Sequence, residues 1–103
     1  MTTREMLELA ARAANIRWDK TDEVWFGDGV GKEWNPDTDD GDSSRMRTKL
    51  RIDVTWLPES VRCEHWEDYD AEAMERLSDH NNDPDAALRL AALRVAAMMG
   101  ERM

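Results

Sequence analysis

The chain has 103 residues, of which 41% are hydrophobic and 36% are charged, and 23 carboxylates against 14 lysines and arginines give a net charge of −9. This length predicts one domain spanning residues 1–103, and five tryptophans indicate a folded chain, because disordered chains are poor in aromatic residues. The negative charge argues against direct binding to nucleic acid or to an anionic membrane, since phosphates are held by lysine and arginine.

Three further features of the sequence bear on the cellular compartment of the protein. No apolar run approaches the roughly 20 residues that span a bilayer, and the charged N-terminus does not fit a signal peptide. Cys63 is the only cysteine, so the chain cannot form an internal disulfide. We therefore expect a cytoplasmic protein.

The first half of the chain predicts a helix and a small hairpin. Thr2 and Glu5 have capping-box spacing ahead of apolar residues at helical intervals, which predicts a helix over about 3–14. Asn15 suits a left-handed stop. Residues 16–18 and 23–26 are rich in β-formers, and Lys20, Thr21 and Asp22 between them favour a hairpin.

The next segment predicts a loop and a short helix. Gly27, Gly29 and Gly31 indicate irregular backbone, because glycine tolerates unusual dihedral angles. Turn-forming residues then precede a helix expected over about 40–50, with aspartates near its N-terminus, where the helix dipole favours negative charge.

The second half of the chain predicts a hairpin and a long helix. Residues 52–57 and 60–66 are β-rich runs separated by Pro58-Glu59, whereas 67–80 fits either a helical turn or an edge strand. Asp83-Pro84 is a helix start, and Gly100 is its expected C-terminal cap. The wide apolar surface of this helix predicts burial against a sheet and also against another helix or a partner chain.

These elements predict an α+β fold. We expect a small antiparallel sheet of 3–5 strands with about three helices on one side, including the long C-terminal helix.

Acidic residues are concentrated in two segments. Residues 64–85 contain nine carboxylates and one cation, Arg76, and residues 19–42 contain nine carboxylates against two lysines. Such segregation of charge indicates a surface that attracts a basic partner, although acidic surfaces also serve solubility alone.

A physical mechanism connects this charge with mimicry of DNA. If 68, 70 and 72 are extended, their carboxylates form a regular row with about 6.6 Å between alternate residues, and neighbouring aromatic rings can stack on arginine. Lysines and arginines that normally hold phosphates could bind such a row. The candidate partner-binding residues are Glu64, Trp66, Glu67, Asp68, Tyr69, Asp70, Glu72 and Glu75, together with Asp37, Asp39 and Asp40.

Signals for catalysis and metal binding are weak. Cys63 and His65 alternate on one predicted strand and could bind zinc with Asp79 or His80, but ordinary packing is the simpler explanation. The aspartates of 37–42 depart from a calcium loop at its glycine and at its final glutamate. We therefore expect a non-enzymatic protein with no cofactor and no metal.

Three segments resemble a family of small phage- and prophage-encoded proteins of unknown function: MTTREMLELAARAA, WNPDTDDGDSSRMRTKLRIDV and DHNNDPDAALRLAALRVAAMMGERM. They cover more than half of the chain, and the sequence departs from the family pattern mainly at 57–78. The resemblance implies a phage protein in a host cytoplasm but no catalytic residue.

By analogy with other small acidic phage proteins, we expect an inhibitor of host defence. The specific expectation is a monomeric anti-CRISPR protein that blocks a nucleic-acid-binding site on a CRISPR effector. The alternative is an accessory or structural phage protein that self-associates through Leu90 and Leu93 of its C-terminal helix.

Overall fold

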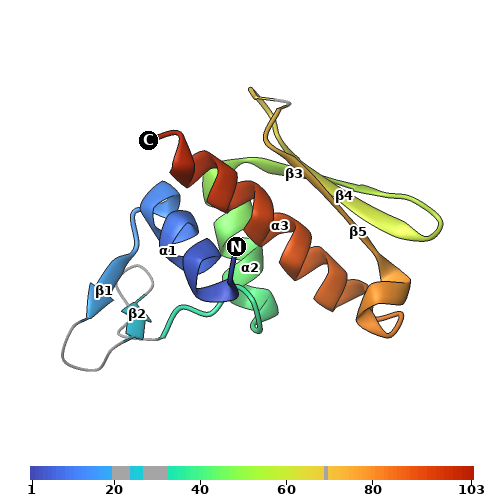
Figure 1. The fold of residues 1–103 in the computed structure, drawn as a ribbon, viewed down its shortest axis with the longest axis horizontal. Helices are drawn as coiled ribbons and strands as arrows, with labels where there is room; N and C mark the ends of the chain where they lie inside the picture. Colours follow the sequence, from blue (N-terminus) through green and yellow to red (C-terminus); the bar gives the residue numbers. More distant parts are fainter. Residues whose placement is uncertain (20–23, 27–32, 69) are drawn as a thin grey trace.

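The computed structural model describes residues 1–19, 24–26, 33–68 and 70–103 and has an α+β fold (Figure 1). The elements are α1 (Thr3–Ala14), β1 (Arg17–Asp19), β2 (Val24–Phe26), α2 (Asp40–Leu50), β3 (Ile52–Trp56), β4 (Ser60–His65), β5 (Glu72–Arg76), the 3-10 helix η1 (Leu77–His80) and α3 (Pro84–Glu101). The predicted fold class is thus confirmed: the described residues form three α-helices, the last of which, α3, is the long C-terminal helix.

Helix α1 begins and ends where the sequence predicts. The Thr2 hydroxyl accepts a bond from the Glu5 backbone N–H, and the Glu5 carboxylate accepts one from the Thr2 backbone N–H. Both bonds lower the pKa of Glu5, and the bond from the Thr2 backbone has the larger effect. Asn15 ends the helix in the left-handed region, with φ of 58°.

Both predicted hairpins are confirmed as antiparallel strand pairs. β1 pairs with β2, with Trp18 opposite Trp25, and β3 pairs with β4, with Val54 opposite Cys63. Lys20, Thr21 and Asp22, and the glycines at 27, 29 and 31, lie outside the described residues.

The ambiguous segment 67–80 contains both a strand and a helical turn. β5 pairs antiparallel with β4, which gives a three-stranded sheet in the order β3-β4-β5 with β5 at one edge. The 3-10 helix η1 follows directly and leads to Asp83, whose carboxylate accepts bonds from the backbone N–H groups of Asp85 and Ala86 at the start of α3.

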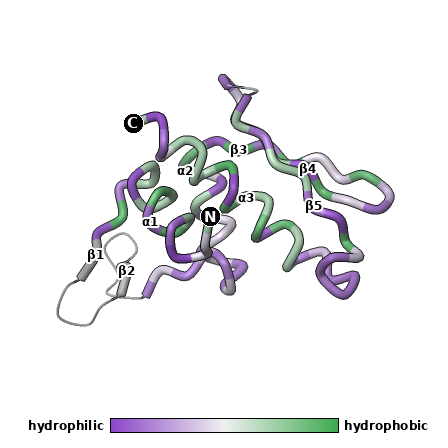
Figure 2. The backbone as a smooth tube through the Cα atoms, in the orientation of Figure 1, coloured by the Kyte–Doolittle hydropathy of each residue, from purple (hydrophilic) through white to green (hydrophobic). Residues whose placement is uncertain are grey.

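Helix α3 packs between α1 and one face of this sheet (Figure 1). Hydrophobic residues are concentrated along α3 (Figure 2), and the core contains Leu93 and Val95 of α3, Val61 and Cys63 of β4, and Met46 of α2. The sequence prediction that α3 is buried against a sheet and a further element is confirmed, and the further element is α1.

The predicted C-terminal cap of α3 is wrong. Gly100 lies within the helix, which continues to Glu101 and has Arg102 as its cap residue. A Cβ at Gly100 would lie 1.9 Å from the carbonyl oxygen of Leu9 on α1. Glycine at this position therefore permits the close approach of α1 and α3. It does not act as a left-handed cap.

Candidate functional site

The sheet has one covered face and one open face. Val61, Cys63 and Ala73 point toward α3 and are buried. Because side chains alternate along a strand, residues between them point the other way, and these include the exposed Asp53, Glu72 and Met74. We call this second side the outer sheet face.

A row of three carboxylates crosses the outer sheet face. The strand register places Asp53 of β3 opposite Glu64 of β4, and Glu64 opposite Glu72 of β5. Neighbouring strands lie about 4.8 Å apart, so this row concentrates negative charge, and like charges directly opposite each other are destabilising. Asp53 lies outside both acidic segments of the sequence, and only strand pairing brings it into this row, so the sequence pattern does not indicate it.

Arg62 partly compensates this row. Its Nη2 lies 2.9 Å from Oε2 of Glu64 and 3.6 Å from Oε2 of Glu72. The hydrogen bond to Glu64 is the main cause of the raised pKa of Arg62, followed by the charges of Glu64 and Glu72. Glu64 is thereby held in place, whereas Glu72 and Asp53 stay exposed to solvent.

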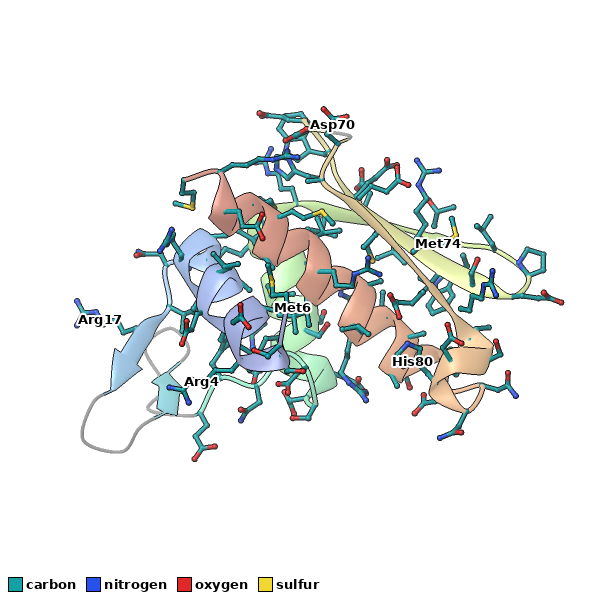
Figure 3. The ribbon with its side chains drawn as sticks, in the orientation of Figure 1. Arg4, Met6, Arg17, Asp70, Met74 and His80 are labelled. Atoms are coloured by element: carbon teal, nitrogen blue, oxygen red, sulfur yellow. The ribbon has the colours of Figure 1, made fainter. Side chains whose placement is uncertain are left out.

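The turn between β4 and β5 extends this acidic surface. Its described residues are 66–68 and 70–71, which we call the acidic turn, and Figure 3 shows Asp70 at its tip. Asp68 forms an ion pair with Arg102 and accepts a 3.1 Å bond from the backbone N–H of Asp70. Glu67 and Asp70 are exposed, and their carboxylates have no ion-pair partner within the described part of the chain.

The acidic turn also bears an exposed aromatic ring. The Trp66 side chain is 42% exposed, and the Arg51 guanidinium lies 5.4 Å from its ring centroid, within cation–π distance. Tyr69, its expected companion, lies outside the described residues. Trp66 thus already contacts an arginine in the way that the sequence analysis envisages for a partner's arginine.

Two expectations about this segment need correction. Asp68 and Asp70 belong to a turn and not to a strand, so the row expected along 68, 70 and 72 does not form; the row of the outer sheet face runs across the strands instead. Glu75 lies on the covered face, where its carboxylate pairs with Arg94 and lies 2.9 Å from Nε2 of His80.

The second predicted cluster lies far from the first. Asp37, Asp39 and Asp40 lie at the start of α2, across the molecule from the acidic turn (Figure 1). Asp39 accepts a 2.8 Å bond from the Asp42 backbone N–H, and Asp40 pairs with Arg89 at 2.5 Å.

Asp37 belongs to the same structural arrangement. Its backbone carbonyl accepts a 3.0 Å bond from Nε of Arg89. These contacts cap α2 and join it to α3, so the cluster has a structural role, and the structure does not bring it to the acidic turn.

Asp42 has a buried carboxylate whose role the sequence pattern alone did not predict. Its Oδ2 accepts a 3.0 Å bond from the Asn35 backbone N–H, and its Oδ1 lies 2.6 Å from Arg45. Asp42 therefore ties the loop before α2 to the helix. The turn chemistry of 34–44 was the available signal for this role.

Cys63 and His65 share the covered face, as their alternation predicts. Cys63 is fully buried, and this burial raises the pKa of its thiol to about 11, although nearby Arg47 acts in the opposite direction. The thiol is therefore neutral near pH 7. His80 contacts Glu75 instead of Cys63, and the described residues contain no group of three histidine, cysteine, aspartate or glutamate side chains able to hold a metal ion.

An apolar groove lies between α1, α3 and β5. It has a volume of about 570 Å³ and is lined by Met1, Met6, Glu75, Leu90, Arg94, Ala97, Met98 and Glu101. We call it the methionine groove. Figure 3 shows Met6 at the centre of this side of the molecule. Leu93, named in the self-association alternative, is fully buried in the core, so Leu90 alone of that pair reaches this surface.

Comparison with known proteins adds no relative. No family model matches the chain, and neither a curated protein nor a solved structure is significantly similar to it. The resemblance of three segments to phage proteins therefore stays a prediction. None of the helices in the described ranges is both long and apolar enough to cross a membrane.

Proposed function

We propose that this protein is a non-enzymatic inhibitor that occupies a nucleic-acid-binding site on a host protein. The surface that would bind comprises the outer sheet face and the acidic turn. The observation that carries the proposal is the Asp53–Glu64–Glu72 row on a face that α3 does not cover, followed at the end of β4 and β5 by a turn with the exposed carboxylates of Glu67 and Asp70.

The geometry suits lysine and arginine side chains that normally hold phosphates. Asp53 and Glu72 are exposed and lie two strand spacings, about 10 Å, apart, and each can accept charge-assisted hydrogen bonds from a basic groove. The paired carboxylates contribute less, because Arg62 and Arg102 already neutralise Glu64 and Asp68. Glu67 and Asp70 are therefore the residues that bind the partner most directly.

The phage resemblance narrows the class of inhibitor. Under this proposal the protein is a phage-encoded anti-CRISPR protein acting in the host cytoplasm, and its partner is a CRISPR effector whose nucleic-acid channel is basic. The partner's identity rests on that resemblance and on charge complementarity, which also steers association.

The test is a charge reversal at the two carboxylates without a structural partner. We expect the E67K/D70K variant to lose capture of a basic nucleic-acid-binding protein from a bacterial host lysate, while the wild-type chain retains it. Added duplex DNA should displace the wild-type interaction, because both ligands occupy one site.

A matched variant controls for charge alone. Glu59 and Asp79 are exposed carboxylates outside the proposed surface, so E59K/D79K changes the net charge equally and should still capture the partner. Equal capture by E67K/D70K and E59K/D79K, or failure of DNA to compete, would overturn the proposal.

A further inference from the structure

Among the described residues, strand β5 has one side without a neighbouring strand. Backbone bonds from His65 N–H to the Ala71 carbonyl (3.0 Å) and from Leu77 N–H to the Glu59 carbonyl (2.9 Å) flank its pairing with β4. Because hydrogen bonding alternates along antiparallel strands, the backbone groups of residues 72, 74 and 76 point away from β4. The Met74 carbonyl accordingly accepts a 3.4 Å bond from Nη1 of Arg94.

This edge lacks proline and lysine, two of the features that usually prevent strand addition, although it carries other charges, including Glu75 on the covered face. Natural edge strands are protected by proline, lysine, bulges or a covering element, and the sequence of β5, EAMER, has neither proline nor lysine. Met74 at its centre is 46% exposed on the outer sheet face. Apart from the Met74 carbonyl, which already accepts the bond from Arg94, the edge therefore offers outward-pointing backbone groups and an apolar side chain.

The charges of β5 are complementary to those of its own copy. An antiparallel pair centred on Met74 places Glu72 opposite Arg76 of the partner subunit, and Arg76 opposite Glu72 of the partner subunit. Directly opposed side chains lie about 4.5–5.5 Å apart, close enough for opposite charges to stabilise the pair. Met74 then faces Met74 of the partner subunit, and no like charges meet.

We propose that two copies of this chain, in place of the monomer expected from the sequence, pair through β5 and form a continuous six-stranded antiparallel sheet. The contact is isologous, with its two-fold axis at Met74. The opposite edge, β3, is less suited: pairing centred on Val54 would oppose Asp53 and Thr55, which are not complementary charges.

The methionine groove adjoins this edge. Arg94 lines the groove and also reaches the Met74 carbonyl and the Glu75 carboxylate. A two-fold axis perpendicular to the sheet keeps both copies of α3 on the same side, and because Glu75 of β5 lines the groove, the proposed pairing brings the partner copy next to it. Leu90 and Met98, which are only partly buried within one chain, then become covered by apolar surface.

The test is sedimentation equilibrium from about 1 μM to about 1 mM protein. The 11.9 kDa chain should reach twice this mass in a concentration-dependent way. Arg76→Glu places two glutamates opposite each other and should weaken dimerisation at least about tenfold. The swapped variant E72R/R76E restores both opposite-charge pairs and should regain the dimer.

Two further variants distinguish dimerisation through β5 from dimerisation through another surface. Asp53→Arg changes charge on the opposite edge strand and should leave the dimer intact, and Leu90→Gln should weaken it. A wild-type chain that stays monomeric throughout, or a dimer sensitive to Leu90→Gln but not to Arg76→Glu, would refute pairing through β5. Glu67 and Asp70 lie outside β5, so failure of either proposal leaves the other testable.

Discussion

The burial and contacts of a single residue in this protein depend on its position in the fold more than on its residue type. Three tryptophans have described side chains, and Trp34 is buried whereas Trp56 and Trp66 are 51% and 42% exposed. Cys63 and Glu75 show the same dependence, since strand alternation turns both toward α3. A cysteine with potential reactivity thereby becomes part of the core.

Burial of Cys63 predicts a specific loss of stability at alkaline pH. The pKa of its thiol is about 11 in the folded chain against an ordinary value of 9.0, so the unfolded chain releases the proton first. The contribution of the neutral thiol to the free energy of unfolding is fully present below pH 9. It should fall by on the order of 2 kcal/mol as the pH rises to 11. Urea unfolding from pH 7 to 11 measures this, and the Cys63→Ala variant should lack this component. Parallel pH profiles for the two chains would contradict it.

Among the elements, the contact between α1 and α3 is the closest. Three alanines of α1, at positions 10, 11 and 14, are buried, as are Ala92 and Ala96 of α3. Small side chains let the helices approach, and Gly100 marks the tightest point. The end of α3 is thus held by α1 and also, through Arg102, by Asp68 of the acidic turn.

Gly100→Ala should therefore destabilise the fold, although alanine ordinarily favours helix. The added Cβ would meet the Leu9 backbone at 1.9 Å, and overpacking of this kind costs about 1–3 kcal/mol. The change in free energy of unfolding by urea is the measurement. Gly41→Ala is the control, because its Cβ would meet only side-chain atoms of Arg45 and Asp39, at 3.2 Å, and its effect should be smaller. Equal effects would argue against close packing at Gly100.

At the scale of the whole molecule, the described carboxylates fall into two groups: those that form ion pairs inside the fold and those that are exposed on its surface. Carboxylates at the start of α2 and on the covered face are paired with arginines of α3. Those of the acidic turn and the outer sheet face are only partly compensated. Part of the net charge of −9 therefore lies on these two surfaces.

This imbalance predicts that moderate salt stabilises the protein. Self-repulsion of a highly charged chain opposes the compact state, and salt screens it within about 8 Å at physiological ionic strength. The melting temperature should rise by a few degrees between low salt and ~0.15 M NaCl, as about 1 kcal/mol corresponds to roughly 4–8 °C at this size. E67K/D70K, which changes the net charge of −9 by four units, should show a smaller rise. A fall with salt would mean that ion pairs outweigh repulsion.

Most helix and strand positions follow from local chemistry. Thr2, Asp39 and Asp83 are side-chain caps at helix starts, and Asn15 ends α1, as residues of these types do in most proteins. The same rule fails at Gly100. A glycine near a helix end can either adopt left-handed angles as a cap or allow close packing of another helix, and only the neighbouring Leu9 carbonyl distinguishes these two roles.

The candidate site was less predictable than the fold. The acidic segment and Trp66 could be chosen from composition, but which carboxylates share a surface depends on strand register. Asp53 was missed for this reason, and Glu75 was assigned to a surface that it does not reach. Arginines that neutralise Asp40 and Asp68 come from α3 and the C-terminus, which are distant along the chain.

By itself, the sequence determined the fold class, most of the caps and the concentration of negative charge, because helix starts, turns and alternation are local properties. Only the tertiary structure decided which carboxylates are free. An ion pair or a strand pair joins residues far apart in sequence, as Arg102 joins Asp68 and Glu64 joins Asp53. The resulting electrostatic surface is a property of distances in space, which the order of residues does not contain.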